Sequence, residues 1–237
     1  KTLQKCIDLA VPAVNIYSSG FAEVGLSGAQ MQDELLSQIK SSDTLICGPN
    51  SQGIANFHHP MVAYFSSELG LKESPAGPIG FVGHSGVMGG IVARECIDRG
   101  IGIGYLVSLG NEIDVSLSDV ISHMSMNTNI SAIGAYVETV RDPLSLKDAI
   151  YFAQSRNVTV VILKGGKNEV ASKAAASHTA AMVGDWETHV SALRQWGAVV
   201  VDNMEELIDS IELWRIIGLV EDSLQVIFKI LLQNAIK

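Results

Sequence analysis

The sequence predicts an α/β protein built around a doubly wound parallel sheet, for two reasons. Its 237 residues are 47% hydrophobic and only 17% charged, a balance typical of strands that are covered on both faces. From about residue 79 onward, short apolar segments of strand character alternate with longer segments of helical periodicity, which is the order expected of a flavodoxin-like sheet. The length allows one large domain or two modest ones.

The elements of this sheet follow one another in regular alternation. The expected strands are Ile79 to Val82, Gly104 to Val107, Ala132 to Val137, Val158 to Leu163 and Ala198 to Val201. The expected helices are Val87 to Arg99, Leu117 to Met126, Leu144 to Arg156, Asp185 to Trp196 and Met204 to Ile217. Ligands of such sheets collect at the carboxyl ends of the strands, so the residues that follow each strand are the first candidates for a site.

The part before residue 70 predicts the end of a different α/β domain. Its expected elements are strands at Ala13 to Tyr17 and Thr44 to Cys47, a helix over Ser27 to Lys40 and a short helix at the start. These units are too few for a complete domain. The weakly periodic stretch from His58 to Pro78 predicts a domain boundary. The predicted parts are residues 1–70, residues 77–217 and a C-terminal helical segment over residues 219–237.

Charge and composition argue against several functions. The formal net charge of -9 and the isoelectric point near 5.1 disfavour nucleic acid and membrane surfaces as partners. The three cysteines show neither a metal spacing nor a disulfide framework, which favours a reducing, cytoplasmic setting. No apolar run approaches the roughly 18 residues of a membrane span, and no signal peptide opens the chain. Lys1 is not an initiator methionine, so we expect further sequence upstream.

A strand, a turn of small residues and a helix start occur together between Gly80 and Gly90. The first-turn amides of a helix are unpaired and carry the positive end of its dipole, so Ser85, Gly86 and Val87 are candidates for binding a phosphate group. The pattern leaves an alternative equally open, namely a plain strand-to-helix connection capped by the Ser85 side chain.

His178 is a second candidate, in a loop of small residues that follows Lys164 to Lys167. Its small neighbours leave the imidazole exposed, and a neutral ring nitrogen can accept a phosphoryl group and pass it on. Most exposed loop histidines are inert, however, and the other five form no metal-ligand cluster, so no metal site is expected. Glu138 ends a buried strand, where it caps a loop, pairs with Arg141, or hydrogen-bonds to His178 and stabilises the imidazolium.

Six sequence motifs occur in a fixed order along the chain. They are SSGFAEVG (18–25), GPNSQGIANF (48–57), GPIGFVGHSGVMG (77–89), SLGNEIDVSLSDVI (108–121), AYVETVRDP (135–143) and KGGKNEVASKAAASHTAAMVGD (164–185). Together they resemble the ADP-forming acyl-CoA synthetases, which belong with succinyl-CoA synthetase, and they cover about residues 1 to 215. The resemblance implies the later half of a Rossmann-like CoA-binding domain up to about residue 70, followed by a flavodoxin-like ligase domain.

The resemblance also implies roles for individual residues. In this family a loop histidine carries phosphate from an acyl phosphate to an ATP-grasp unit. The implied catalytic residues are His178 and its supporting Glu138, and the implied phosphate-binding residues are Ser85, Gly86 and Val87. The implied CoA contacts are Ser19, Gly20, Phe21 and Asn50.

The chain departs from the family pattern at four positions. Relatives usually carry cysteine at Ser51, many carry glutamine at His84, and glycine is common at Ala180, where alanine would stiffen the loop slightly. Succinate-specific relatives carry tyrosine at the position of Gly90. We therefore expect Gly90 to contact the substrate and to admit a different, bulkier acyl group.

The favoured function is that of an NDP-forming acid:CoA ligase component, which works through an acyl phosphate and a phosphohistidine. CoA is the expected cofactor, and a magnesium-bound nucleotide is expected on an ATP-grasp beta unit or fused domain outside this sequence, with an oligomer as the expected state. One alternative is the CoA-binding module of a protein acetyltransferase, which has no need of His178. Another is a non-catalytic CoA-responsive binding protein. The pattern determines neither the acyl substrate nor the nucleotide.

Overall fold

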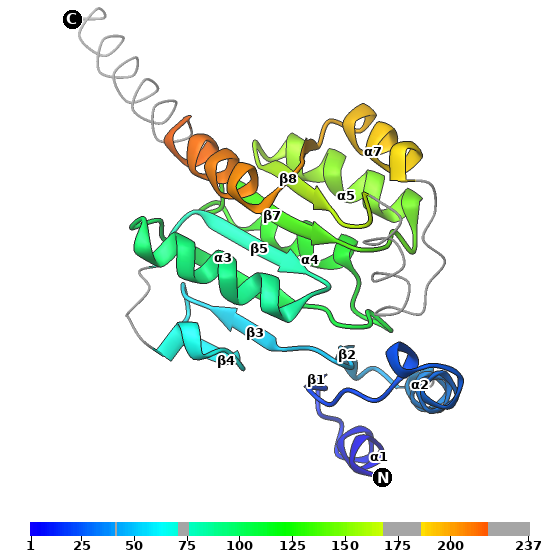
Figure 1. The fold of residues 1–237 in the computed structure, drawn as a ribbon. Coiled ribbons are helices and arrows are strands. Elements are labelled where there is room, and N and C mark those ends of the chain that lie inside the picture. Colours follow the sequence, from blue (N-terminus) through cyan, green and yellow to red (C-terminus); the bar gives the residue numbers. More distant parts are fainter. Residues whose placement is uncertain (41, 71–75, 168–185, 218–237) are drawn as a thin grey trace, which may run out of the picture.

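The computed structural model of the protein describes residues 1–40, 42–70, 76–167 and 186–217. It contains a two-stranded sheet and a seven-stranded sheet, each with helices beside it (Figure 1). The elements of the first part are α1 (Thr2–Asp8), β1 (Ala13–Asn15), η1 (Ala22–Val24), α2 (Leu26–Ile39) and β2 (Leu45–Cys47). Because β1 and β2 are parallel, the loops that follow them leave the same edge of the small sheet.

Five strands of the larger sheet are parallel to one another. They are β5 (Ile79–Gly83), β6 (Ile103–Ser108), β7 (Ala132–Val137), β8 (Thr159–Lys164) and β9 (Val199–Val201). β5 pairs with β6 on one side and with β7 on the other, and β8 and β9 follow β7. Numbered in chain order, these strands lie in the order 2-1-3-4-5, which is the flavodoxin-like doubly wound order. The predicted fold class is confirmed.

Helices cover both faces of this sheet. They are α3 (Gly86–Asp98), α4 (Leu117–Met126), α5 (Pro143–Ser155), α7 (Trp186–Gln195) and a helix over residues 204–217. α3 and the helix over residues 204–217 lie on one face, and α4 and α5 lie on the other (Figure 1). Within the described ranges, none of the helices is both long and apolar enough to cross a membrane.

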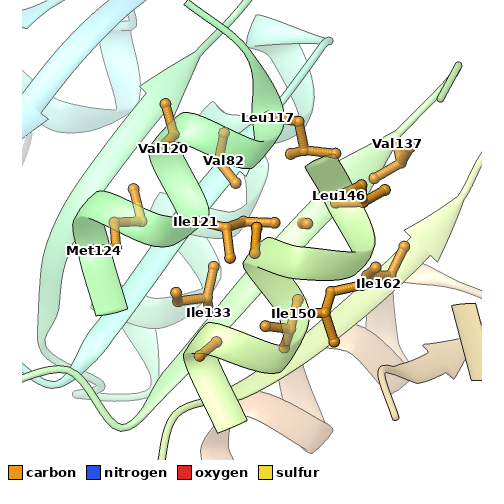
Figure 2. Close-up of a cluster of buried hydrophobic side chains, with 14 of the residues drawn as sticks. Val82, Leu117, Val120, Ile121, Met124, Ile133, Val137, Leu146, Ile150 and Ile162 are labelled. Carbon is orange, nitrogen blue, oxygen red and sulfur yellow. The ribbon is translucent and has the colours of Figure 1, made fainter. Parts of the chain in front are cut away.

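Two apolar cores hold these helices on the sheet. Figure 2 shows the core on the α4 and α5 face, where Ile121 and Ile150 are fully buried together with Val82 of β5. Phe81, the neighbour of Val82, belongs to the core on the opposite face, which includes residues of α3. Successive side chains of a strand point to opposite faces, so a strand between two helical layers is apolar along its whole length.

Two strands, β3 (Gly53–Asn56) and β4 (Met61–Tyr64), were not predicted from the sequence. They form an antiparallel pair at the edge of the larger sheet, where β3 is hydrogen-bonded to β6. Their pattern is weak because each strand is short and three of the four residues of β4 are exposed. The division at about residue 70 stays a prediction, although β3 and β4 precede it and join the sheet that follows it. The predicted segment over residues 219–237 lies outside the described residues.

Side-chain caps start two of the helices that follow the carboxyl edge of the larger sheet. Ser116 and Asp119 form a reciprocal capping box at the start of α4. Asp142 accepts hydrogen bonds from the amides of Leu144 and Ser145 at the start of α5. These caps satisfy backbone amides that the helix itself leaves unpaired, so the two loops enter their helices in a defined direction.

For Ile150→Ala we expect the free energy of unfolding to fall by about 2–5 kcal/mol, since Ile150 is fully buried and its truncation leaves a cavity under α5. Leu144→Ala on the same helix is the matched control because Leu144 is 72% exposed. Its expected effect is within about 0.5 kcal/mol. Urea unfolding followed by circular dichroism measures both, and equal losses would contradict the burial of this face of α5.

Candidate functional site

The winding of the larger sheet reverses between β5 and β7, and this place is the topological switch point of the sheet. Ligands of doubly wound sheets bind outside the carboxyl ends of the strands at the switch point. β5 and β7 are paired through Gly83 and Tyr136, so Ser85 and Glu138 follow the paired residues closely. His84 joins the two loops, because its amide donates to the Tyr136 carbonyl at 3.2 Å and its Nδ1 accepts from the Glu138 amide at 3.0 Å. The structure therefore brings Ser85 and Glu138 to one edge.

The start of α3 has the uncapped amides that a phosphate site requires. Ser85 is the N-cap residue, but its side chain makes no capping hydrogen bond, so the alternative of a plain capped connection lacks its defining contact. Val87 in the first turn is 62% exposed. At Gly86 a Cβ atom would stand 2.2 Å from Gln52 Cγ, so the close approach of Gln52 requires glycine. Such a helix end attracts anions through its amides and its dipole.

Glu138 lies at the end of β7 as a buried carboxylate, 6% exposed. Arg141, the partner considered for it in one alternative, contacts Glu112, with 3.4 Å between Arg141 Nε and Glu112 Oε2. The proposed support of His178 by Glu138 stays a prediction because His178 lies outside the described residues.

Lys164 belongs to this edge, although the sequence analysis did not identify it as a site residue. It ends β8, is 3% exposed, and its Nζ donates to the carbonyls of Glu138 and Gly165, both at 2.7 Å. Burial lowers the pKa of Lys164 to about 8, although the Glu138 carboxylate acts to raise it. A lysine at the end of an otherwise apolar strand is the local signal for such a residue. The burial of its amino group arises only in the folded chain.

The residues predicted to contact CoA lie at the carboxyl edge of the small sheet. Ser19, Gly20 and Phe21 follow β1, and Asn50 follows β2. The Asn50 amide donates to the Ser18 carbonyl at 2.9 Å, so the structure brings the two predicted segments together. Ser19 is exposed and the other three are partly buried.

Glu23 and Asn111, neither of which the sequence analysis identified, connect this edge to the larger sheet. Glu23 Oε1 accepts hydrogen bonds from the amides of Gly20 and Phe21 at 2.6 and 3.1 Å. Glu23 Oε2 accepts from Asn111 Nδ2 at 2.6 Å. Burial acts to raise the pKa of Glu23, but the hydrogen bonds from Asn111 and the backbone amides outweigh it and lower the pKa.

Gly90, the predicted substrate residue, lines a groove of about 880 Å³ beside α3. The groove is also lined by Tyr64, Phe65, Val87 and Ile91. Phe65 is 80% exposed. Val87 belongs both to the groove and to the first turn of α3. The groove therefore begins at the candidate phosphate site and continues past Gly90.

A doubly wound sheet with an uncapped helix start at its switch point defines the class of this protein, a flavodoxin-like α/β protein with a candidate anion site at the carboxyl edge. Comparison with known protein families identifies the family within this class. Residues 76–214 match the family described as the succinyl-CoA ligase like flavodoxin domain, and the chain belongs to this family. The resemblance seen in the six motifs is thus confirmed.

Two curated relatives and one solved structure show how the chain relates to longer proteins. It is 29% identical over 208 residues to the ADP-forming acetate–CoA ligase II subunit alpha of Pyrococcus furiosus, covering 88% of this chain and 44% of the relative. It is 31% identical over 209 residues to the ADP-forming 4-hydroxybutyrate–CoA ligase of Nitrosopumilus maritimus, covering 87% and 30%.

The solved structure is the dinucleotide-forming acetyl-coenzyme A synthetase 1 of Ca. Korarchaeum cryptofilum in complex with phosphate and ADP. Its similarity to this chain has a TM-score of 0.81 at 26% identity, over 89% of this chain and 44% of that one. The chain spans less than half the length of each of these three proteins.

The lowered pKa of Lys164 predicts a pH dependence of stability with a definite sign. A lysine in the unfolded chain has a pKa of about 10.4. Between about pH 8 and pH 10, the unfolded chain therefore holds a proton that Lys164 of the folded chain has released. The contribution of Lys164 to the free energy of unfolding therefore rises with pH in this window. One proton gives a slope of at most about 1.4 kcal/mol per pH unit.

Lys164→Met removes this proton, so the slope that it contributes is expected to disappear. Urea unfolding of the variant and the wild type at several pH values measures the difference. Lys5→Met, at an exposed position of α1, is the control and is expected to keep the wild-type slope. A wild-type slope in Lys164→Met would contradict the burial of this amino group.

Proposed function

We propose that this chain is the acyl-CoA-handling part of an NDP-forming acid:CoA ligase. The observation that carries the proposal is the convergence of the uncapped start of α3 with the buried carboxylate of Glu138 at the switch point of the sheet. Phosphoryl transfer to a histidine needs a place that holds the anion and a carboxylate that orients the imidazole. Membership of the succinyl-CoA ligase like family and the names of the relatives support the same reaction.

The proposed reaction has three reversible steps. At the start of α3, phosphate takes the acyl group from acyl-CoA, which gives an acyl phosphate and releases the thiol of CoA. A ring nitrogen of His178 then attacks the phosphorus, the bond to the acyl oxygen breaks, and the acid leaves as a carboxylate. Finally the phosphoryl group passes from His178 to an NDP, which becomes the NTP and leaves the free imidazole.

Each residue of the site has a proposed role in these steps. The amides from Ser85 to Val87 hold the charged oxygens of the phosphate and of the acyl phosphate. Glu138 accepts the N–H of the second ring nitrogen of His178, which fixes its tautomer and stabilises the imidazolium. Lys164 holds the main chain at Glu138 and adds positive charge to an edge that receives an anion.

The CoA site is proposed at the carboxyl edge of the small sheet, where Ser19, Gly20, Phe21 and Asn50 lie on adjoining loops. This placement fits the ligand, since CoA supplies a thiol on a long arm and this edge is linked to the switch point through Asn111. The acyl group is proposed to lie in the groove beside Gly90. The groove has room for a group larger than acetyl.

The nucleotide is proposed to bind a second unit of ATP-grasp type with magnesium, either as a beta subunit or as a fused domain in a larger assembly. The Pyrococcus furiosus relative is named a subunit alpha, and the solved structure of Ca. Korarchaeum cryptofilum holds ADP and phosphate. A reducing compartment such as the cytoplasm is proposed, since all three cysteines are free thiols.

Incubation of the complete enzyme with labelled ATP and magnesium tests the proposal. We expect acid-labile, base-stable phosphate on this chain and none in His178→Ala, since no other residue is proposed to carry it. His59→Ala, at an exposed loop position, is the control and is expected to label as the wild type does. Label that persists in His178→Ala would refute the phosphohistidine. A chain that binds CoA but never takes label would be a CoA-binding module instead.

Glu138→Gln keeps the size of the side chain but removes the charge that stabilises the imidazolium. We expect His178 to be phosphorylated about 10²-fold more slowly, with the thermal unfolding midpoint within a few degrees of the wild type. Rapid-quench labelling measures the rate and circular dichroism the fold. Labelling at the wild-type rate would show that Glu138 does not support the histidine.

A further inference from the structure

His84 is a buried histidine, 4% exposed, whose two ring nitrogens are both engaged. Nδ1 accepts the amide hydrogen of Glu138 at 3.0 Å, and Nε2 lies 3.0 Å from Glu112 Oε2. A backbone amide can only donate, so Nδ1 must carry its lone pair, and the ring hydrogen is on Nε2, where it is donated to the carboxylate. The structure therefore fixes the tautomer of His84. It also makes His84 unsuitable as a phosphate carrier, because neither nitrogen is open to a ligand.

Glu112, the partner of His84, is itself held from three directions. Its backbone has a φ of 51°, which is unusual for a residue with a side chain. Its Oε1 accepts from the amide of Leu117 at the start of α4 at 2.6 Å, while Oε2 faces His84 and Arg141. With these donors around it, the buried carboxylate has compensation for its loss of water, and it fixes the direction of the His84 ring.

The hydrogen bonds continue from this pair to the candidate CoA turn. Arg141 Nη2 donates to the Asn111 carbonyl at 2.9 Å, and the Asn111 side chain donates to Glu23 at 2.6 Å. Glu23 accepts the amides of the turn at Gly20 and Phe21. One polar network therefore runs from the CoA turn of the small sheet to the main chain of Glu138 at the switch point.

We propose that His84 is the positioning residue for Glu138, and that it is the point where this network reaches the phosphoryl-transfer site. The role rests on the proposed function. In it, His84 sets the direction in which the chain turns at the end of β7, and so the place of the Glu138 carboxylate. Because one chain of hydrogen bonds joins the two places, the same contacts hold the CoA turn and the supporting glutamate in one arrangement.

The two hydrogen bonds of the His84 ring predict which side chain can replace histidine and keep both of them. A glutamine has an acceptor oxygen and a donor nitrogen on one planar group, so Gln at position 84 can accept from the Glu138 amide and donate to Glu112. Leucine fills a similar volume and offers neither atom. The amide of Glu138 and the carboxylate of Glu112 would then lose a buried partner.

The experiment compares wild type, His84→Gln, His84→Leu and the control His59→Leu as complete enzymes. In His84→Leu we expect the maximum rate of His178 phosphorylation to fall about 10²-fold, since small misplacements of a catalytic group are costly. In His84→Gln we expect the rate to return to within about threefold of the wild type. Thermal unfolding of the two position-84 variants separates misplacement from unfolding, and His59→Leu is expected to match the wild type in both measurements.

Nitrogen-15 NMR of histidine-labelled protein gives an independent readout. We expect a signal of the Nε2–H tautomer that is missing in both position-84 variants. A proton on Nδ1, a doubly protonated ring, labelling of folded His84→Leu at the wild-type rate, or failure of glutamine to restore the rate in a folded variant would each overturn the proposal. If the wild type takes no label, the proposed function fails, while the NMR signal still decides whether His84 holds the Glu138 amide.

Discussion

The parallel register of β5 against β7 is the constraint on which the candidate site depends. Ser85 and Glu138 each follow a paired residue of these strands by two positions, so they leave the sheet at the same level. The cores hold the register, since Phe81 packs into one and Val82 into the other, and a slip by one residue would exchange their faces. A Cβ atom at Gly80 would stand 2.7 Å from the sulfur of Met124, so a slip that brought a side chain to this position would require the buried Met124 to move.

The same edge concentrates buried charge, which is costly unless every group has a partner. Lys164 donates to two main-chain carbonyls, and Glu112 receives the amide of Leu117 together with His84 and Arg141. These partners come from different loops, so compensating the charges also ties the loops together. α4 and α5 begin with side-chain caps, whereas α3 does not. The arrangement is thus organised without a bound ligand, and such preorganisation is the condition for strong electrostatic stabilisation of the proposed anion.

The sequence predicts the sheet better than the contacts of the site. Strands β5 to β9 are apolar runs because helices cover both faces, and the places of Ser85 and Glu138 follow from strand ends alone. The short edge strands β3 and β4 lack that pattern. Asn111 was not identified, and Arg141 was considered only as a partner of Glu138, because their contacts join residues 88 and 30 positions apart and no periodicity records the direction of a side chain. The role of His178 rests on the resemblance to a family.

Asn111 indicates how the two sheets are placed relative to each other. It is 2% exposed; its amide donates to the Pro49 carbonyl at 2.8 Å, and its side chain donates to Glu23 and Gln32. Hydrogen bonds weaken steeply with angle, whereas apolar contact has no preferred direction, so these bonds set an orientation that apolar contact alone would leave open. The Asn111 carbonyl also accepts from Arg141. A shift of the small sheet therefore changes the contacts of the residue that holds Arg141, and the geometry of the switch point depends on how the carboxyl edge of the small sheet, the candidate CoA edge, is placed.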